Sequence, residues 1–252
     1  MKKQFLTLLV ATATAFTACK DNDDPVIRTK VLSKLISIED GDTTTHAFNY
    51  DSNKRLTSFG TADNTEKTSF TYDAGGNLTK VENIEGDSKQ VFEAVYTNAI
   101  PVTGSLKTYD EGQLQSTTNL EYTIASGKVT EIIQKVQTQQ SAKSTLTYQN
   151  GNVTKIETVL TAGGTYTRTY TYGTKKSMLT NPAVKYVLDP AGITASFIAK
   201  NEVLTENFDS PGTEFDVNSN TVYTYDSQGY PLTATVTSDE EVVTLKFEYK
   251  EI

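Results

Sequence analysis

A tyrosine-centred repeat runs through most of the chain and constrains its fold more than any other feature. Most units place an apolar residue two positions before a Tyr, have Asp, Asn or Gly in the turn that follows, and continue with Leu or Val. Repeats of this length are typical of chains built from identical supersecondary units. Most consecutive tyrosines lie 22 to 26 residues apart, and the larger gap from 172 to 225 predicts that one unit has been replaced. The key tyrosines are Tyr50, Tyr72, Tyr96, Tyr122, Tyr148, Tyr172, Tyr225 and Tyr249.

Each unit predicts a β-hairpin. Aromatic and β-branched residues alternate with polar ones before the turn, and the turn residues tolerate positive φ, most clearly at 150–151. The return strand breaks strict alternation, because its second apolar residue follows the first by three positions, as in Leu56 and Phe59. Either a β-bulge re-aims the strand, or both of its faces carry apolar side chains.

We therefore predict an all-β fold of successive antiparallel hairpins, with a repeat of about 24 residues, forming a long twisted sheet. The sheet should curl toward a barrel or a sandwich. Sequence alone leaves barrel, sandwich and open sheet as alternatives.

The repeat resembles the YD (Rhs-type) repeat, which builds long antiparallel sheets. Two copies match best: Tyr72-Asp73 with Gly76 and Leu78, and Tyr225-Asp226 with Gly229 and Leu232. Several other copies lack the Asp, and the Arg usual after the turn Gly is nearly absent. Over residues 31–252 the chain is similar to a family of Gram-negative, Bacteroides-type outer-membrane lipoproteins with degenerate repeats. This resemblance implies a fold and not an activity.

The N-terminus has the layout of a secretory signal. Lys2 and Lys3 precede a short apolar stretch that ends in small residues before Cys19, and the stretch is too short to span a membrane stably. This arrangement resembles a bacterial lipobox, which implies removal of residues 1–18 and acylation of Cys19, including a palmitate. An ordinary signal peptide with a chance Cys is the alternative.

Residues 19–30 read as an acidic, solvated tether before a single domain at 31–252. The Lys-then-acidic run resembles a surface-export signal of some Gram-negative lipoproteins. We therefore expect an outer-membrane protein, held only by its lipid and facing the cell surface, with the periplasmic face as the alternative. A calcium loop in this run would lack its turn Gly and its bidentate Glu, so no metal site is expected.

The repeat lapses at about 173–220, where a partly helical cap is expected near 178–199 because Asn181-Pro182 is a suitable helix start. This insert either plugs the end or edge of the sheet or serves as a recognition loop. Its candidate contact residues are Met178, Leu179, Tyr186, Leu188 and Phe197.

The composition disfavours several function classes. A net charge of -8 opposes general nucleic-acid binding. His46 is the one imidazole and has no nucleophile motif to serve, so it is interpreted as an ordinary strand residue. Paired carboxylates of a glycan hydrolase would have to come from acids such as Asp51, Asp73, Asp226 and Glu121, which stand at turns or within the repeat.

The sequence thus favours a non-catalytic, lipid-anchored surface binding or structural protein that needs no cofactor. Its partner would be a glycan or another protein, and the oligomeric state stays open. The alternative is an envelope assembly or lipid-handling factor with a curved apolar sheet, and a carboxylate-dependent glycan hydrolase comes third.

Overall fold

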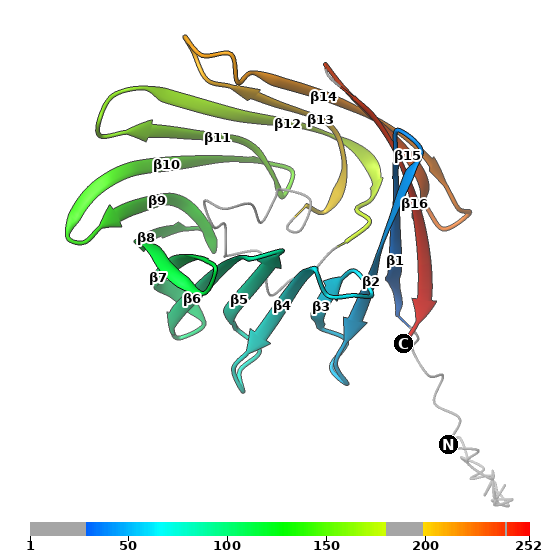
Figure 1. Cartoon of the computed structure of the whole chain (residues 1–252), viewed down its shortest axis with the longest axis horizontal. Helices are drawn as coiled ribbons and strands as arrows, with labels where there is room; N and C mark the ends of the chain where they lie inside the picture. The colour runs from blue at the N-terminus through cyan, green and yellow to red at the C-terminus, as the bar shows by residue number, and fades with distance from the viewer. Residues whose placement is uncertain (1–28, 180–198, 240) are drawn as a thin grey trace, which may run out of the picture.

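The computed structural model describes residues 29–179, 199–239 and 241–252, and their strands close into one antiparallel barrel (Figure 1). Every strand pairs with the next along the chain, and the last pairs with the first. The all-β hairpin prediction is confirmed, and a barrel is the arrangement formed. The strands are β1 (Lys30–Glu39), β2 (Asp42–Tyr50), β3 (Leu56–Gly60), β4 (Glu66–Tyr72), β5 (Leu78–Glu85), β6 (Ser88–Thr97), β7 (Ile100–Asp110), β8 (Gln113–Ala125), β9 (Lys128–Val136), β10 (Gln139–Gln149), β11 (Asn152–Leu160), β12 (Thr165–Lys176), β13 (Asn201–Asp209), β14 (Val217–Tyr225), β15 (Pro231–Ser238) and β16 (Val242–Glu251).

No helix in the described part of the chain has the length and apolar character needed to cross a membrane. Most of the cap expected near 178–199 falls on residues outside the described ranges.

A β-bulge near the start of the return strand explains the three-residue spacing of its apolar side chains. In the first hairpin after the start of the repeat, Tyr50 pairs with Leu56 but Asn49 pairs with Ser58, so Thr57 is the extra residue. The bulge re-aims the strand, and both Leu56 and Phe59 therefore reach the core. The same one-residue shift recurs beside Tyr72, Tyr96, Ile124, Tyr148, Tyr172 and Tyr225.

The hydroxyl of the bulged Thr bonds across the hairpin. Thr57 Oγ1 donates to the carbonyl of Asn49 at 3.1 Å, and equivalent bonds run from Thr79 to Thr71, Thr130 to Thr123 and Thr154 to Thr147. A bulge leaves part of the strand ladder unpaired. The threonine bond therefore satisfies a backbone carbonyl that the bulge would otherwise leave without a hydrogen bond. The recurring Leu-Thr or Val-Thr pair is thus a bulge sequence.

A second recurring bond links one hairpin to the next. Tyr50 Oη donates to the carbonyl of Leu32 at 2.9 Å, so the tyrosine of one unit bonds the first return-strand residue of the preceding unit. Burial raises the pKa of Tyr148 to about 12, as expected for a phenol enclosed by core side chains. The other tyrosine hydroxyl bonds of this kind run from Tyr72 to the carbonyl of Leu56 at 2.8 Å, from Tyr148 to that of Val129 at 2.8 Å and from Tyr172 to that of Val153 at 2.5 Å.

Turn length decides whether Asp follows the tyrosine. Asp73 accepts a bond from the backbone N–H of Asn77, and Gly76 takes a φ of +84° within that longer turn. The turn after Tyr148 has two central residues, Asn150 and Gly151, both at positive φ. A two-residue turn has no place for the Asp, which explains why some copies of the repeat lack it.

Two predictions from the repeat spacing are wrong. Among the described strands no unit has been replaced between Tyr172 and Tyr225, because these residues lie on β12 and β14, two strands apart as in every other unit. The gap of 53 reflects one long connection between β12 and β13. In addition, Ile124 and not Tyr122 takes the position of the key tyrosine, since Ile124 pairs with Val129 at the bulge.

The first strand completes the last repeat. Tyr249 on β16 pairs with Leu32 on β1, and Ser33 is the extra residue of a bulge there. Ser33 Oγ donates to the carbonyl of Glu248 at 2.9 Å, as the bulged threonines do elsewhere. The unit that the C-terminus cuts short therefore takes its return strand from the N-terminal end of the domain, and this closes the barrel.

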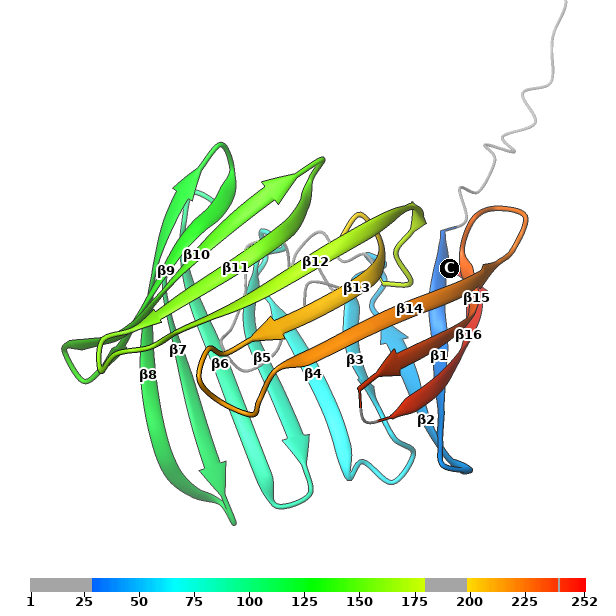
Figure 2. The ribbon, with the colours of Figure 1, turned by 90° about the horizontal axis from the view of Figure 1, so that it is seen from above.

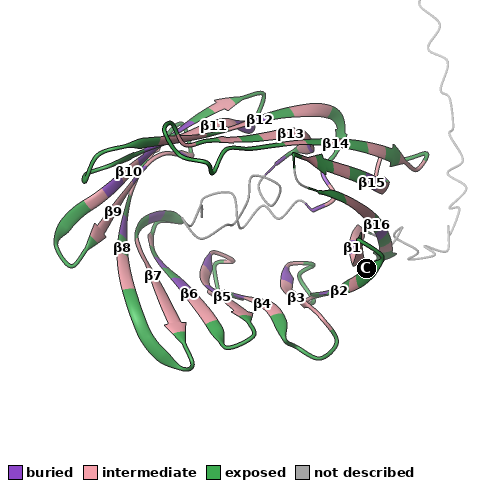
Figure 3. Cartoon of the chain, turned by 45° about the horizontal axis from the view of Figure 1, so that its top comes forward, coloured by how far each residue is buried: buried purple, intermediate pink, exposed green. Residues whose placement is uncertain are grey.

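Buried positions alternate with more exposed ones along many strands of the barrel wall (Figure 3), and most of the buried side chains are apolar. Leu32, Leu78, Phe92, Leu120 and Phe247 belong to one buried cluster that draws on strands around the ring. Many outward positions are polar, as at Thr43, Thr45 and Asn49 on β2, while other strands also expose apolar side chains such as Val95 and Val222. Ion pairs connect neighbouring side chains on this outer wall, including Lys34–Glu248, Lys107–Glu93, Lys135–Glu121 and Lys155–Glu157.

We predict that Tyr148→Phe lowers the free energy of unfolding by about 1 kcal/mol, because it leaves the carbonyl of Val129 without the phenol donor. Urea denaturation measures the change. Tyr96→Phe is the matched control, since the Tyr96 hydroxyl is buried without a hydrogen-bond partner among the described residues. An equal loss in both variants would contradict a role for the recurring tyrosine bond.

Candidate functional site

The turns that follow the key tyrosines all lie at one end of the barrel, which we call the tyrosine-turn end. Successive antiparallel hairpins place alternate connections at opposite ends, and Figure 2 shows the strands running between them. Thr29 and Ile252 exchange two backbone hydrogen bonds at this end, so the domain's chain begins and ends here. The connection between β12 and β13 also starts and returns here.

A pocket of about 770 Å³ opens at the tyrosine-turn end. This volume is within the range typical of small-molecule sites. Its wall combines residues from the turn after β2, the start of β1 and the two ends of the long connection. The lining residues are Thr29, Lys30, Val31, Leu32, Tyr50, Asn53, Lys54, Arg55, Leu56, Gly76, Asn77, Tyr96, Ala99, Lys176, Ser177, Met178, Leu179, Lys200 and Tyr230.

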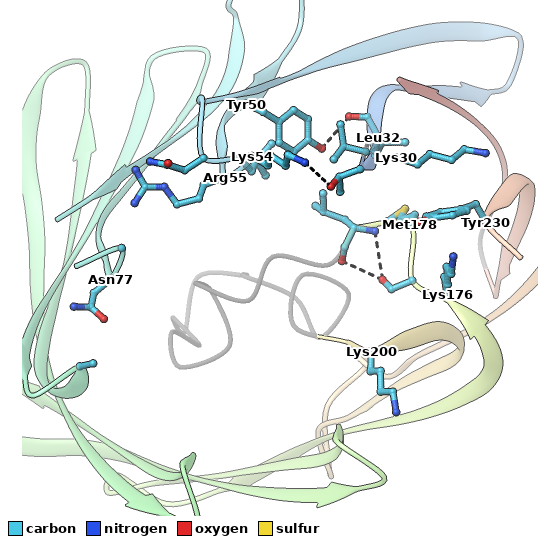
Figure 4. Close-up of a pocket in the computed structure, with 18 of the residues that line it drawn as sticks. Lys30, Leu32, Tyr50, Lys54, Arg55, Asn77, Lys176, Met178, Lys200 and Tyr230 are labelled. Carbon is cyan, nitrogen blue, oxygen red and sulfur yellow. Dashed lines mark hydrogen bonds between the residues drawn. The ribbon is translucent and has the colours of Figure 1, made fainter. Parts of the chain in front are cut away.

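Five cationic side chains line the pocket, and none of its described lining residues is acidic. Lys54 and Arg55 come from the turn between β2 and β3, whereas Lys176 and Lys200 come from the ends of β12 and the long connection (Figure 4). Lys30 is the fifth. Asp51 and Asp226 offset the charges of Arg55 and Lys30, so the excess positive charge of the pocket comes mainly from Lys54, Lys176 and Lys200. In a chain of net charge -8, this local excess suits an anionic ligand.

Two of the cations are fixed by acids of the neighbouring turns. Arg55 Nη2 lies 2.7 Å from Asp51 Oδ2, and its guanidinium lies 4.6 Å from the centre of the Tyr72 ring. The Lys30 ammonium pairs with Asp226. These contacts hold the two side chains in place, and each acid also accepts backbone N–H bonds within its own turn.

Lys176 and Lys200 project from the two ends of the long connection. Lys176 Nζ lies 3.9 Å from the centre of the Tyr230 ring. The backbone N–H of Lys200 donates to Asn152 Oδ1 at 2.7 Å, and Asn152 is itself buried. The connection is therefore anchored at both ends, which fixes the backbone from which these two cations extend.

The deeper wall of the pocket is apolar. Leu32 and Leu56 are each 1% exposed, and Leu179 is 6% exposed and belongs to the same buried cluster. Met178 packs against that cluster. The pocket thus joins a cationic rim to an apolar floor.

Tyr96 contributes an unpaired phenol to this pocket. Its position in the repeat corresponds to that of Tyr50 and Tyr72, but its buried hydroxyl finds no hydrogen-bond partner among the described residues. Burial, with a smaller effect of the Asp73 charge, raises the pKa of Tyr96 to about 12. A buried hydroxyl without a partner is costly, so it is a candidate donor to a ligand.

The residues proposed from sequence fall in different places. Met178 and Leu179 line the pocket, whereas Cys19, Tyr186, Leu188 and Phe197 lie outside the described ranges. No local sequence pattern indicated that the five cations would form a cluster, and the sequence indicated Tyr96 only as a member of the repeat. The one usable signal was that hairpin turns of a single repeat must gather at one end.

The carboxylates considered for a hydrolase have structural contacts. Asp51, Asp73 and Asp226 each accept hydrogen bonds within a turn, and Glu121 pairs with Lys135 on the outer wall. His46 lies toward the opposite end of the barrel, where Nε2 is 2.9 Å from Glu66 Oε2.

The opposite end of the barrel carries strong negative charge. Its described turn residues contain acidic side chains and neither Lys nor Arg. Crowding raises the pKa of Glu39, chiefly through its hydrogen bond to Glu241 and the charge of that same residue. The acids of these turns and of the strand ends that flank them are Glu39, Asp40, Asp42, Asp63, Glu66, Glu85, Asp87, Asp110, Glu111, Asp209, Glu214, Asp216, Asp239 and Glu241.

Comparison with known proteins supports the repeat and the fold. Residues 50–87 match the RHS Repeat family. A porin-like protein from Bacteroides uniformis is 16% identical with a TM-score of 0.52, and the match covers 87% of this chain and 96% of that one. A porin-like protein from Bacteroides vulgatus is 10% identical with a TM-score of 0.56, covering 88% and 99%. No curated protein matches the chain at a significant level. The chain therefore contains an RHS-type repeat within a barrel fold that also occurs in Bacteroides proteins.

We predict that Asp226→Asn makes the barrel less stable than the wild type near neutral pH, and that this difference in stability disappears in acid. The Lys30 ammonium, helped by backbone N–H groups of Tyr230 and Gln228, lowers the pKa of Asp226 to about 2 from an ordinary value of 3.8. The stability that ionised Asp226 contributes is therefore present above pH 4 and is lost as the pH falls toward 2. Urea midpoints of both proteins between pH 5 and pH 2 measure this convergence, and a constant difference would contradict it.

Proposed function

We propose that this protein is a non-catalytic, lipid-anchored binding protein of the outer membrane whose tyrosine-turn pocket takes an anionic ligand. The observation that carries the proposal is the pocket itself, in which Lys30, Lys54, Arg55, Lys176 and Lys200 surround one cavity. Phosphate and carboxylate groups are the anions that such cations recognise.

The aromatic and amide groups of the pocket support binding of more than a bare ion. The Tyr96 hydroxyl can donate a hydrogen bond beside the cations, and the Asn77 amide has a second N–H besides the one it donates to Asp73. Tyr230 also lines the pocket, with Lys176 over its ring. Several donors that converge on one cavity fix the orientation of a ligand. A phosphorylated or carboxylated sugar satisfies these groups.

The apolar floor favours a second candidate, a lipid-handling factor. Leu32, Leu56, Met178 and Leu179 lie beneath the cationic rim, and an amphiphile with an anionic head would contact both parts. The two candidates share the charged group of the ligand and differ in its apolar portion.

The polar outer wall supports attachment through a lipid. A barrel that spans a membrane presents an apolar band to the acyl chains and a polar interior. Here the described outward positions carry many Thr, Lys and Glu side chains among scattered exposed apolar ones such as Val95, Val136 and Val222, and most of the buried residues are apolar. Burying these charged groups in hydrocarbon would cost several kcal/mol per group, so acylation of Cys19 is the better explanation for membrane attachment.

Calorimetric titration tests the ligand class. We expect the mature chain to bind glucose 1-phosphate and not glucose, and Lys176→Gln together with Lys200→Gln to weaken binding at least fivefold, because each loses a charge-assisted contact. Lys246→Gln on the outer wall is the matched control and should bind normally. Tighter binding of decyl phosphate than of glucose 1-phosphate would favour the lipid-handling candidate, whereas equal binding of glucose and its phosphate would contradict the proposal.

Cell fractionation tests the anchor. We expect the wild-type protein in the outer-membrane fraction and Cys19→Ser in the soluble fraction, since a chain without the acyl groups has lost its hydrophobic attachment. Protease treatment of intact cells then reports the side of the membrane. A Cys19→Ser protein that remains in the membrane fraction would argue against lipid anchoring.

A further inference from the structure

The two ends of the barrel carry opposite electrostatic character. The turns opposite the pocket carry acids without Lys or Arg among their described residues. The pocket at the tyrosine-turn end gathers five cations, of which Lys30 and Arg55 pair with Asp226 and Asp51 of the same end. Strands of about ten residues separate the ends by on the order of 25 Å once strand tilt is allowed for. This separation is about three Debye lengths at physiological ionic strength, so a charged surface beside one end interacts mainly with that end.

The N-terminal side of the domain emerges from the cationic end. Thr29 lines the pocket and pairs with Ile252 there. Between Cys19 and Thr29 stand ten peptide units, which can span at most about 35 Å. If Cys19 is the acylated residue, as the proposed function states, the tyrosine-turn end is the end that this short connection brings toward the lipid.

We propose that the tyrosine-turn end docks on an anionic lipid surface of the leaflet that holds the anchor, with an anionic headgroup entering the pocket. Lys54, Lys176 and Lys200 face that surface, and the acidic end points away from it. The reversed orientation would bring the acidic turns against negative headgroups and repel them. The inference rests on the proposed anion pocket and adds its partner and its orientation.

Vesicle co-sedimentation tests docking without the lipid anchor. The mature chain from residue 19 with Cys19→Ser is mixed with vesicles of phosphatidylcholine alone or with 30% phosphatidylglycerol. We expect at least tenfold tighter binding to the anionic vesicles at 0.15 M salt and loss of this preference at 0.5 M, because each basic residue near such a surface contributes about fivefold in affinity. Equal binding to both vesicle types would overturn the proposal.

Matched charge variants locate the docking surface. Lys54→Gln, Lys176→Gln and Lys200→Gln together should abolish the preference for anionic vesicles. Lys67→Gln, Lys107→Gln and Lys246→Gln remove the same charge from strand positions outside the pocket and should keep most of the preference. Equal losses in the two triple variants would overturn the assignment to this end.

The test separates this inference from the proposed function. A protein that binds glucose 1-phosphate but shows no preference for anionic vesicles retains its anion pocket and refutes docking. A protein that prefers anionic vesicles, loses the preference in the pocket variant and ignores glucose 1-phosphate supports docking and refutes the soluble ligand class.

Discussion

The β-bulge near the start of each return strand is the feature on which the rest of this barrel depends. It turns two apolar side chains, three positions apart, toward the same interior, as Leu56 and Phe59 show. It also increases local twist, which a sheet needs in order to close on itself. Where the extra residue is a threonine or serine, as at Thr57 and Ser33, its hydroxyl also bonds a carbonyl of the partner strand. A repeat of short motifs thereby specifies curvature as well as pairing.

Closure follows from the same chemistry. The last tyrosine, Tyr249, meets Leu32 and the bulged Ser33 of the first strand, in the way that Tyr50 meets Leu56 and Thr57. Open sheet edges expose unpaired backbone groups, and a chain that supplies its own final return strand removes them. The Lys30–Asp226 pair lies at this junction, so the seam and the pocket share residues. Stability of the seam and the shape of the pocket are thus coupled.

The arrangement of polarity separates this barrel from one that spans a membrane, although the solved structures of similar fold are described as porin-like. Ion pairs and hydroxyl side chains recur along the described outer wall between scattered exposed apolar residues, and apolar side chains form the buried cluster inside. The fold alone therefore does not determine what this protein does. What distinguishes this molecule is the cationic, apolar-floored pocket where its turns converge.

The sequence by itself determined the hairpins, their antiparallel order and the side of each turn, because these follow from alternation, spacing and turn chemistry within about 24 residues. It left the three-residue apolar spacing ambiguous and led to the wrong conclusion that a unit was missing before Tyr225. Local patterns cannot show that β1 completes the repeat begun by β16, since that pairing joins Leu32 to Tyr249 across nearly the whole chain. For the same reason they could not reveal the pocket. Lys30, Lys54, Arg55, Lys176 and Lys200 come together only because closure of the ring brings turns far apart in sequence to one rim.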